Sequence, residues 1–170
     1  MFGEYRASTG VDGQAFAVAG DGWPALRARV AAHVAATGTR PRLLVGKPGL
    51  DGHSSGAEVV AVAASSAGLE VVFTGIRQAP EEIVAAAVQE GVDVVGLSIL
   101  SGSHVELAAA VVAGLAAAGA GAIPVVVGGI VPDADAERLR ALGVARVFTP
   151  SDFQLVDIVG GLLDVVGVAR

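Results

Sequence analysis

One glycine-rich stretch, residues 47–56, concentrates the side chains of this sequence that could do chemistry. It reads Lys-Pro-Gly-Leu-Asp-Gly-His-Ser-Ser-Gly and places His53 two residues after Asp51. A short apolar run, residues 43–45, precedes the stretch, and a helix-like segment follows it. The pattern predicts a turn between a strand and a helix, which in an open parallel sheet lies at the carboxyl edge, where ligands bind.

Three roles are open to His53: a metal ligand, a general base, or a residue that caps the following helix. Asp51 can accept a hydrogen bond from Nδ1 of the imidazole, which leaves Nε2 free for a metal. A zinc site would need three or four protein ligands, but only His104 offers a second imidazole nearby, and the chain has no cysteine. A metal that brings its own equatorial ligands needs one protein ligand, and this description fits a tetrapyrrole-like cofactor.

Strand-like and helix-like segments alternate from residue 42 onward. Predicted strands cover residues 43–45, 70–73, 92–97, 124–127 and 146–148, and predicted helices cover residues 54–67, 80–89, 104–118, 133–142 and 152–166. The first four of these helices are followed by residues suited to a left-handed helix end, Gly68, Gly91, Gly119 and Gly143. The alternation predicts an α/β fold of the flavodoxin-like (Rossmann-like) kind, a five-stranded parallel sheet of order 2-1-3-4-5 with helices on both faces.

The first part of the chain has a different pattern. Residues 1–22 show no steady period and are predicted to form an extended arm, whereas residues 23–36 have the apolar spacing of an amphipathic helix. We therefore expect a linker-like N-terminal arm and helix over residues 1–39, and one ligand-binding domain over residues 40–170.

Composition argues against several classes of function. The chain has 17 acidic and 11 basic residues, a net charge of -6, and no basic stripe, so nucleic acid is not expected as a partner. The absence of cysteine excludes disulfides and fits a reducing cytoplasm. The uncharged stretch 107–132 is broken by Gly119 and Gly121 and then has strand character, which predicts a buried helix and strand and no membrane span.

Three loops should meet at the carboxyl edge of this sheet. They are residues 47–56, residues 98–103 and the pair Gly128-Gly129. Glycines leave room for a bulky ligand near the backbone, while Ser98 offers a hydroxyl and Leu100 an apolar wall. These loops predict a deep, mostly apolar slot with one imidazole at its mouth.

Other ligands of this architecture fit the sequence less well. A phosphoacceptor receiver domain needs an aspartate after the third strand, where Ser98 stands, and a flavin site wants aromatic walls, but Tyr5 and Trp23 lie outside the sheet unit. The phosphate-binding and dinucleotide-binding glycine fingerprints are absent.

Three motifs occur in order on the edge loops: Asp51-Gly-His53-x-x-Gly56, then Ser98-x-Leu100, then Gly128-Gly129. Together they resemble the cobalamin-binding domain of adenosylcobalamin-dependent mutases, over roughly residues 40–168. The sequence Gly-Lys-Pro-Gly-Leu-Asp-Gly-His over residues 46–53 most resembles that of the acyl-CoA mutases. This branch of the family includes methylmalonyl-, ethylmalonyl-, isobutyryl- and 2-hydroxyisobutyryl-CoA mutases.

The resemblance implies a base-off, His-on cofactor. His53 would be the lower axial ligand of cobalt, Asp51 would hold His53, and Lys47 would extend that relay. The dimethylbenzimidazole tail of the cofactor would leave cobalt and fill the slot. The residues implied in cofactor contact are Asp51, Gly52, His53, Ser54, Gly56, Ser98, Leu100, Gly128, Gly129 and Thr149.

The resemblance also implies an activity, the radical rearrangement of the carbon skeleton of an acyl-CoA with adenosylcobalamin. The (β/α)₈ barrel that binds acyl-CoA in this family is not in this sequence. We therefore expect a cobalamin-carrying subunit or domain that is inactive alone and needs a barrel-type acyl-CoA mutase large subunit. The alternative function is a non-catalytic corrinoid carrier, sensor or cofactor-delivery protein.

Overall fold

Five parallel strands form the centre of the protein, which a computed structural model describes over residues 20–49, 55–99, 102–149 and 154–170. The strand order is β2-β1-β3-β4-β5, and every neighbouring pair is parallel, so the predicted topology is confirmed. The strands are β1 (Arg42–Gly46), β2 (Glu70–Phe73), β3 (Val94–Ser98), β4 (Val125–Gly128) and β5 (Arg146–Phe148).

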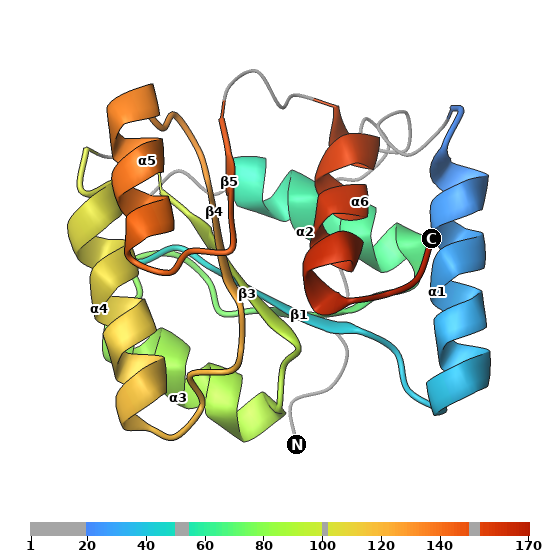
Figure 1. The fold of residues 1–170 in the computed structure, drawn as a ribbon, viewed down its shortest axis with the longest axis horizontal. Helices are drawn as coiled ribbons and strands as arrows, with labels where there is room; N and C mark the ends of the chain where they lie inside the picture. Colours follow the sequence, from blue (N-terminus) through green and yellow to red (C-terminus); the bar gives the residue numbers. More distant parts are fainter. Residues whose placement is uncertain (1–19, 50–54, 100–101, 150–153) are drawn as a thin grey trace.

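Helices cover both faces of the sheet (Figure 1). One face carries α3, α4 and α5, the other carries α2 and α6, and α1 packs against α2 and α6. The helices are α1 (Trp23–Thr37), α2 (Ser55–Ala67), α3 (Pro80–Glu90), α4 (His104–Ala117), α5 (Asp133–Ala141) and α6 (Leu155–Val166). None of these helices is long and apolar enough to cross a membrane, a finding confined to the described residues.

Alternating strand residues divide between two hydrophobic cores. In β1, Leu43 and Val45 belong to the core under α2 and α6, while Leu44 belongs to the core under α3 to α5. All three side chains are buried, as expected for a parallel sheet that is covered on both faces. Small residues on α2, such as Ala61 and Ala64, let that helix approach the sheet closely.

The glycines predicted to end four helices are confirmed, but the third and fourth strands begin later than predicted. Four glycines with positive φ follow the helices as the sequence indicated: Gly68, Gly91, Gly119 and Gly143. The third strand was predicted over residues 92–97 and is observed as Val94–Ser98, and the fourth was predicted over residues 124–127 and is observed as Val125–Gly128. The carboxylate of Asp93 accepts a hydrogen bond from the backbone nitrogen of Arg42 at 2.8 Å, and the pairing of β1 with β3 starts one residue later, at Leu43 and Val94.

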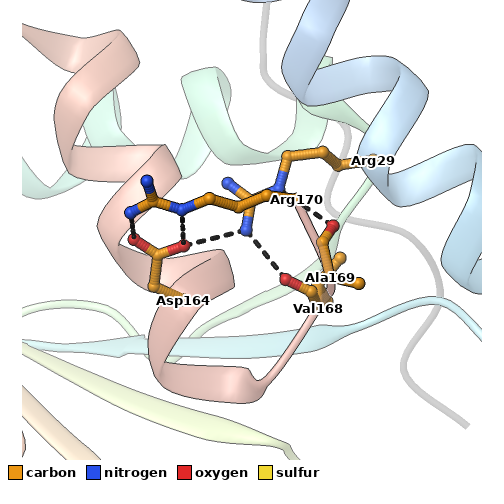
Figure 2. Close-up of polar contacts among 5 residues, drawn as sticks. All are labelled: Arg29, Asp164, Val168, Ala169 and Arg170. Atoms are coloured by element: carbon orange, nitrogen blue, oxygen red, sulfur yellow. Dashed lines mark hydrogen bonds and ion pairs between the residues drawn. The ribbon is translucent and has the colours of Figure 1, made fainter.

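Arg29 of α1 ties this helix to the C-terminal end of the chain (Figure 2). Its Nη2 donates to Oδ1 of Asp164 at 2.9 Å and to the carbonyl oxygen of Val168 at 2.8 Å, and its Nε donates to the carbonyl oxygen of Ala169 at 3.2 Å. Arg170 also donates to Asp164. The residues that join α1 to α6 are therefore polar as well as apolar.

The carboxylate of Asp164 makes the stability of the protein depend on pH. The hydrogen bond from Arg170, and then that from Arg29, hold the pKa of Asp164 below its ordinary value despite some desolvation. A lowered pKa stabilises the fold above the ordinary carboxyl pKa, and this contribution is lost as pH falls through the folded value. We expect Asp164→Asn to lower the free energy of unfolding by at most about 1 kcal/mol at neutral pH, since such pairs contribute little. In denaturant titrations this deficit should shrink toward zero below about pH 4, and a deficit that grows with acid would contradict the assignment.

Candidate functional site

A slot lies between the sheet and the two helices α2 and α6. Its volume is about 210 Å³, and since a water molecule occupies about 30 Å³ of liquid, it is far larger than a packing defect. The slot is lined by Leu43, Val45, Gly56, Ala57, Val60, Gly96, Leu97, Ser98, Val126, Gly128, Gly129, Phe148, Thr149, Ile158 and Leu162.

Five residues that the sequence placed at a cofactor site line this slot, namely Gly56, Ser98, Gly128, Gly129 and Thr149. The sheet brings them together because Ser98 pairs with Gly128, and Gly128 pairs with Phe148. Gly56 comes from the first turn of α2, across the slot from the strands. The described residues of the loops that were predicted to converge therefore meet at the carboxyl edge.

Lys47 follows β1 and is buried, with 1% of its surface exposed. Its Nζ lies 3.5 Å from both the carbonyl oxygen and the Oγ of Ser98, which joins the first and second edge loops. Hydrogen bonds with Gln78 hold the backbone here, from Gln78 N to Lys47 O and from Gly49 N to Gln78 O. A buried lysine head group needs polar partners, and two oxygen atoms of Ser98 lie within reach of this one.

The remaining predicted site residues, Asp51, Gly52, His53, Ser54 and Leu100, lie outside the described residues. The described residues next to the first segment are Gly49 and Ser55, and those next to the second segment are Ile99 and Gly102. Among the residues that the structure describes, no group of three or more His, Cys, Asp or Glu side chains could hold a metal ion.

The glycines around the slot serve two different purposes. Gly129 has a φ of 139°, and a Cβ there would collide with the carbonyl oxygen of Ile99, so the backbone itself requires glycine. A Cβ on Gly128 would meet its nearest atom, Phe148 Cβ, at 3.7 Å, and a Cβ on Gly56 would meet nothing within 4 Å. The fold does not demand glycine at Gly56 and Gly128, but a ligand in the slot would.

The sequence reasoning missed several residues that line the slot. Gly96 lies within the central strand β3, where a Cβ would be in ordinary contact at 3.4 Å or more, and Phe148 of β5 and Leu162 of α6 form apolar walls. A glycine inside a strand weakens it and often marks the close approach of a ligand. That signal at Gly96 could have been read from the sequence.

His104 does not belong to the slot lining. It begins α4 and is 1% exposed, and its Nδ1 lies 3.8 Å from Oδ2 of Asp135 on α5. Neither ring nitrogen has a hydrogen-bond partner in the described structure. His104 therefore packs on the face covered by α4 and α5, away from the helices that wall the slot.

The chemistry of the slot suits a flat apolar group with few polar atoms. Among the described lining residues there is no charged side chain, and the side-chain polar atoms are the hydroxyls of Ser98 and Thr149. The ring of Phe148 offers a surface for stacking. A phosphate or a free metal ion would find no opposite charge among these lining residues. An aromatic base would bury its apolar surface against apolar walls, which is favourable.

Comparisons with known proteins agree with this description. The family model described as "B12 binding domain" matches residues 41–158. Ethylmalonyl-CoA mutase from Methylorubrum extorquens is 49% identical over 166 residues, which are 98% of this chain and 24% of that protein. The 2-hydroxyisobutanoyl-CoA mutase small subunit from Aquincola tertiaricarbonis is 45% identical over 106 residues, 62% of this chain and 78% of that protein.

Among solved structures, a cobalamin-binding protein from Desulfitobacterium hafniense has a TM-score of 0.66 at 21% identity, over 86% of this chain and 70% of that one. This likeness supports the flavodoxin-like fold. The chain spans about a quarter of the length of ethylmalonyl-CoA mutase. On the match of its sequence over most of the sheet and helices, this chain belongs to the B12-binding domain family.

Proposed function

We propose that this chain binds adenosylcobalamin in the base-off, His-on form, as the cobalamin-carrying subunit or domain of an acyl-CoA mutase. The observation that carries the proposal is the slot, an apolar cavity at the carboxyl edge whose walls include glycines that the fold itself does not need. Membership of the B12-binding domain family supports the same cofactor.

The loop after β1 would hold the cobalt. In this proposal His53 would ligate the cobalt through its imidazole, Asp51 would accept the hydrogen bond from the other ring nitrogen, and Lys47 would balance the carboxylate. Such a carboxylate fixes the tautomer and the orientation of a metal-binding imidazole. The burial of Lys47 at the foot of this loop, in contact with Ser98, supports the relay.

The slot would take the nucleotide tail. Gly56, Gly96 and Gly128 leave the space for the base, Phe148 gives a stacking surface, and Ser98 can hydrogen-bond a ring nitrogen. When bound, the cofactor would supply the radical chemistry, and this chain would supply position and the axial ligand. Ser54, Leu100 and Thr149 are proposed to contact the cofactor at the mouth of the slot.

A larger partner would supply the acyl-CoA site. The relative from Aquincola tertiaricarbonis is named a small subunit, and this chain covers 78% of it. We propose a barrel-type large subunit as the partner, residues 40–170 as the cobalamin-binding domain, and residues 1–39 as the segment that leads into it.

The test is reconstitution with separate barrel subunits of acyl-CoA mutases. We expect the full chain, adenosylcobalamin and a matching barrel to isomerise one acyl-CoA of a panel, and each component alone to be inactive. The control replaces the chain with its Gly128→Val variant. Tight cobalamin binding without turnover with any barrel would instead support a carrier or delivery protein, and absence of cobalamin binding would refute both functions.

A further inference from the structure

Helix α1 packs on the two helices that wall the slot, on the sides that face away from it. Its buried residues Trp23, Leu26 and Val30 belong to the same hydrophobic core as α2 and α6. Figure 1 shows α1 at the end of the molecule where α2 and α6 lie, beside the C-terminus. The position of α1 is therefore coupled to the walls of the slot, although α1 itself contributes no lining residue.

Helix α6 lies between the slot and α1. Ile158 and Leu162, one helical turn apart, line the slot. Positions offset by two residues face α1: a Cβ on Gly160 would lie 3.6 Å from Leu26 Cδ2, and Val156 Cγ2 lies 2.9 Å from the Cβ position of Gly22. A shift of α6 toward or away from α1 would therefore move the slot wall by a similar distance.

Helix α2 is held by the same helix. Its first turns carry the lining residues Ala57 and Val60, and its last turn meets α1. There Arg27 Nε donates to the carbonyl oxygen of Ser66 at 3.2 Å, and Val30 Cγ1 lies 2.9 Å from the Cβ position of Gly68. One helix thus contacts both walls, so it limits how far they can separate.

Arg29 makes the polar contacts between α1 and the C-terminal end of α6. Its side chain is 13% exposed and donates to Asp164 of α6 and to the carbonyl oxygens of Val168 and Ala169 just after that helix (Figure 2). A planar guanidinium makes these bonds in fixed directions, which a lysine cannot reproduce. These hydrogen bonds hold the C-terminal end of α6 against α1, on the side of α6 that faces away from the slot.

We propose that α1 is a brace that sets the width of the slot, and that Arg29 is a positioning residue for the nucleotide tail of cobalamin. This inference rests on the proposed function. Packed interiors transmit small displacements, so weakening the brace lets α6 move and changes the shape of the cavity. Because the tail must leave between α2, α6 and the sheet, the dissociation rate of cobalamin should respond more than the structure of the bound state.

The test measures cobalamin dissociation from the full chain, with Arg29→Ala compared with wild type. We expect release to be about five- to tenfold faster, and amide hydrogen exchange in α6 to increase, while the absorption spectrum of the bound cobalamin stays unchanged because the axial ligand is untouched. Arg29→Lys should restore part of the slow release, and it also serves if Arg29→Ala does not fold.

The matched control is Arg42→Ala. Arg42 bonds Glu70 of β2 and the carbonyl oxygen of Glu90 of α3, a helix on the opposite face of the sheet from α2 and α6. Its loss should lower stability without changing release. Equal release from wild type and both Arg29 variants would overturn the brace, as would an equal acceleration by Arg42→Ala. Failure of wild type to bind cobalamin would overturn the proposed function as well, and so differs from failure of the brace alone.

Discussion

Gly128→Val should greatly weaken cobalamin binding while leaving the free protein at least as stable as wild type. The valine methyl groups would enter the slot beside Phe148 and occupy space that the nucleotide base needs. Overpacking of a filled site costs about 1–3 kcal/mol, which corresponds to a loss of affinity of roughly five- to 150-fold. Without the cofactor the same methyl groups fill a cavity, and valine is favoured over glycine in a strand. Equilibrium titration with cobalamin and thermal unfolding of the free protein measure the two effects.

The neighbouring glycine provides the contrast. Gly129→Ala should destabilise the fold itself, because its φ of 139° is unfavourable for alanine and its Cβ would collide with the Ile99 carbonyl. Stability and binding should therefore separate in Gly128→Val and fall together in Gly129→Ala. If Gly128→Val bound cobalamin with wild-type affinity, the nucleotide tail would lie elsewhere, and the assignment of the slot would be wrong.

His53→Ala should remove the nitrogen of the protein from the cobalt. We expect cobalamin affinity to fall by about ten- to a hundredfold or more, since even the outer partners of metal ligands contribute that much. In electron paramagnetic resonance of the Co(II) form, the splitting from an axial imidazole nitrogen should be lost. The nucleotide tail keeps its slot in this variant, so residual binding should remain sensitive to Gly128→Val.

His33→Ala is the control for loss of an imidazole elsewhere. His33 is partly buried on α1 and lies outside both the edge loops and the slot lining. This variant should keep the wild-type cobalt spectrum. An unchanged cobalt spectrum in His53→Ala would show that another group occupies the axial position.

The pattern of the sequence was sufficient for the architecture. Runs such as residues 43–45 are apolar at every position because both faces of a parallel sheet are buried, and glycines such as Gly68 and Gly91 end helices where a left-handed residue is needed. Once the strand order is fixed, the carboxyl ends of β1, β3 and β4 become neighbours. The convergence of Lys47, Ser98 and Gly128 follows from that order.

The depth of the slot was harder to predict, for a physical reason. Phe148, Ile158 and Leu162 have the apolar character and spacing of ordinary core residues, and nothing in a single sequence distinguishes a side chain that packs on a neighbour from one that faces a cavity. Their role depends on the distance between sheet and helices, which α1 helps to set. Gly96 was the one interior position whose residue type signalled the cavity.

The most direct test of the account asks which nitrogen binds the cobalt. The chain is prepared with nitrogen-15 histidine, loaded with unlabelled cobalamin, reduced to the Co(II) form and examined by electron paramagnetic resonance. If a histidine of this chain is the axial ligand and the nucleotide base has moved into the slot, the axial splitting changes from a triplet to a doublet. If the triplet persists, the cofactor keeps its own base on cobalt, and the base-off, His-on account is contradicted.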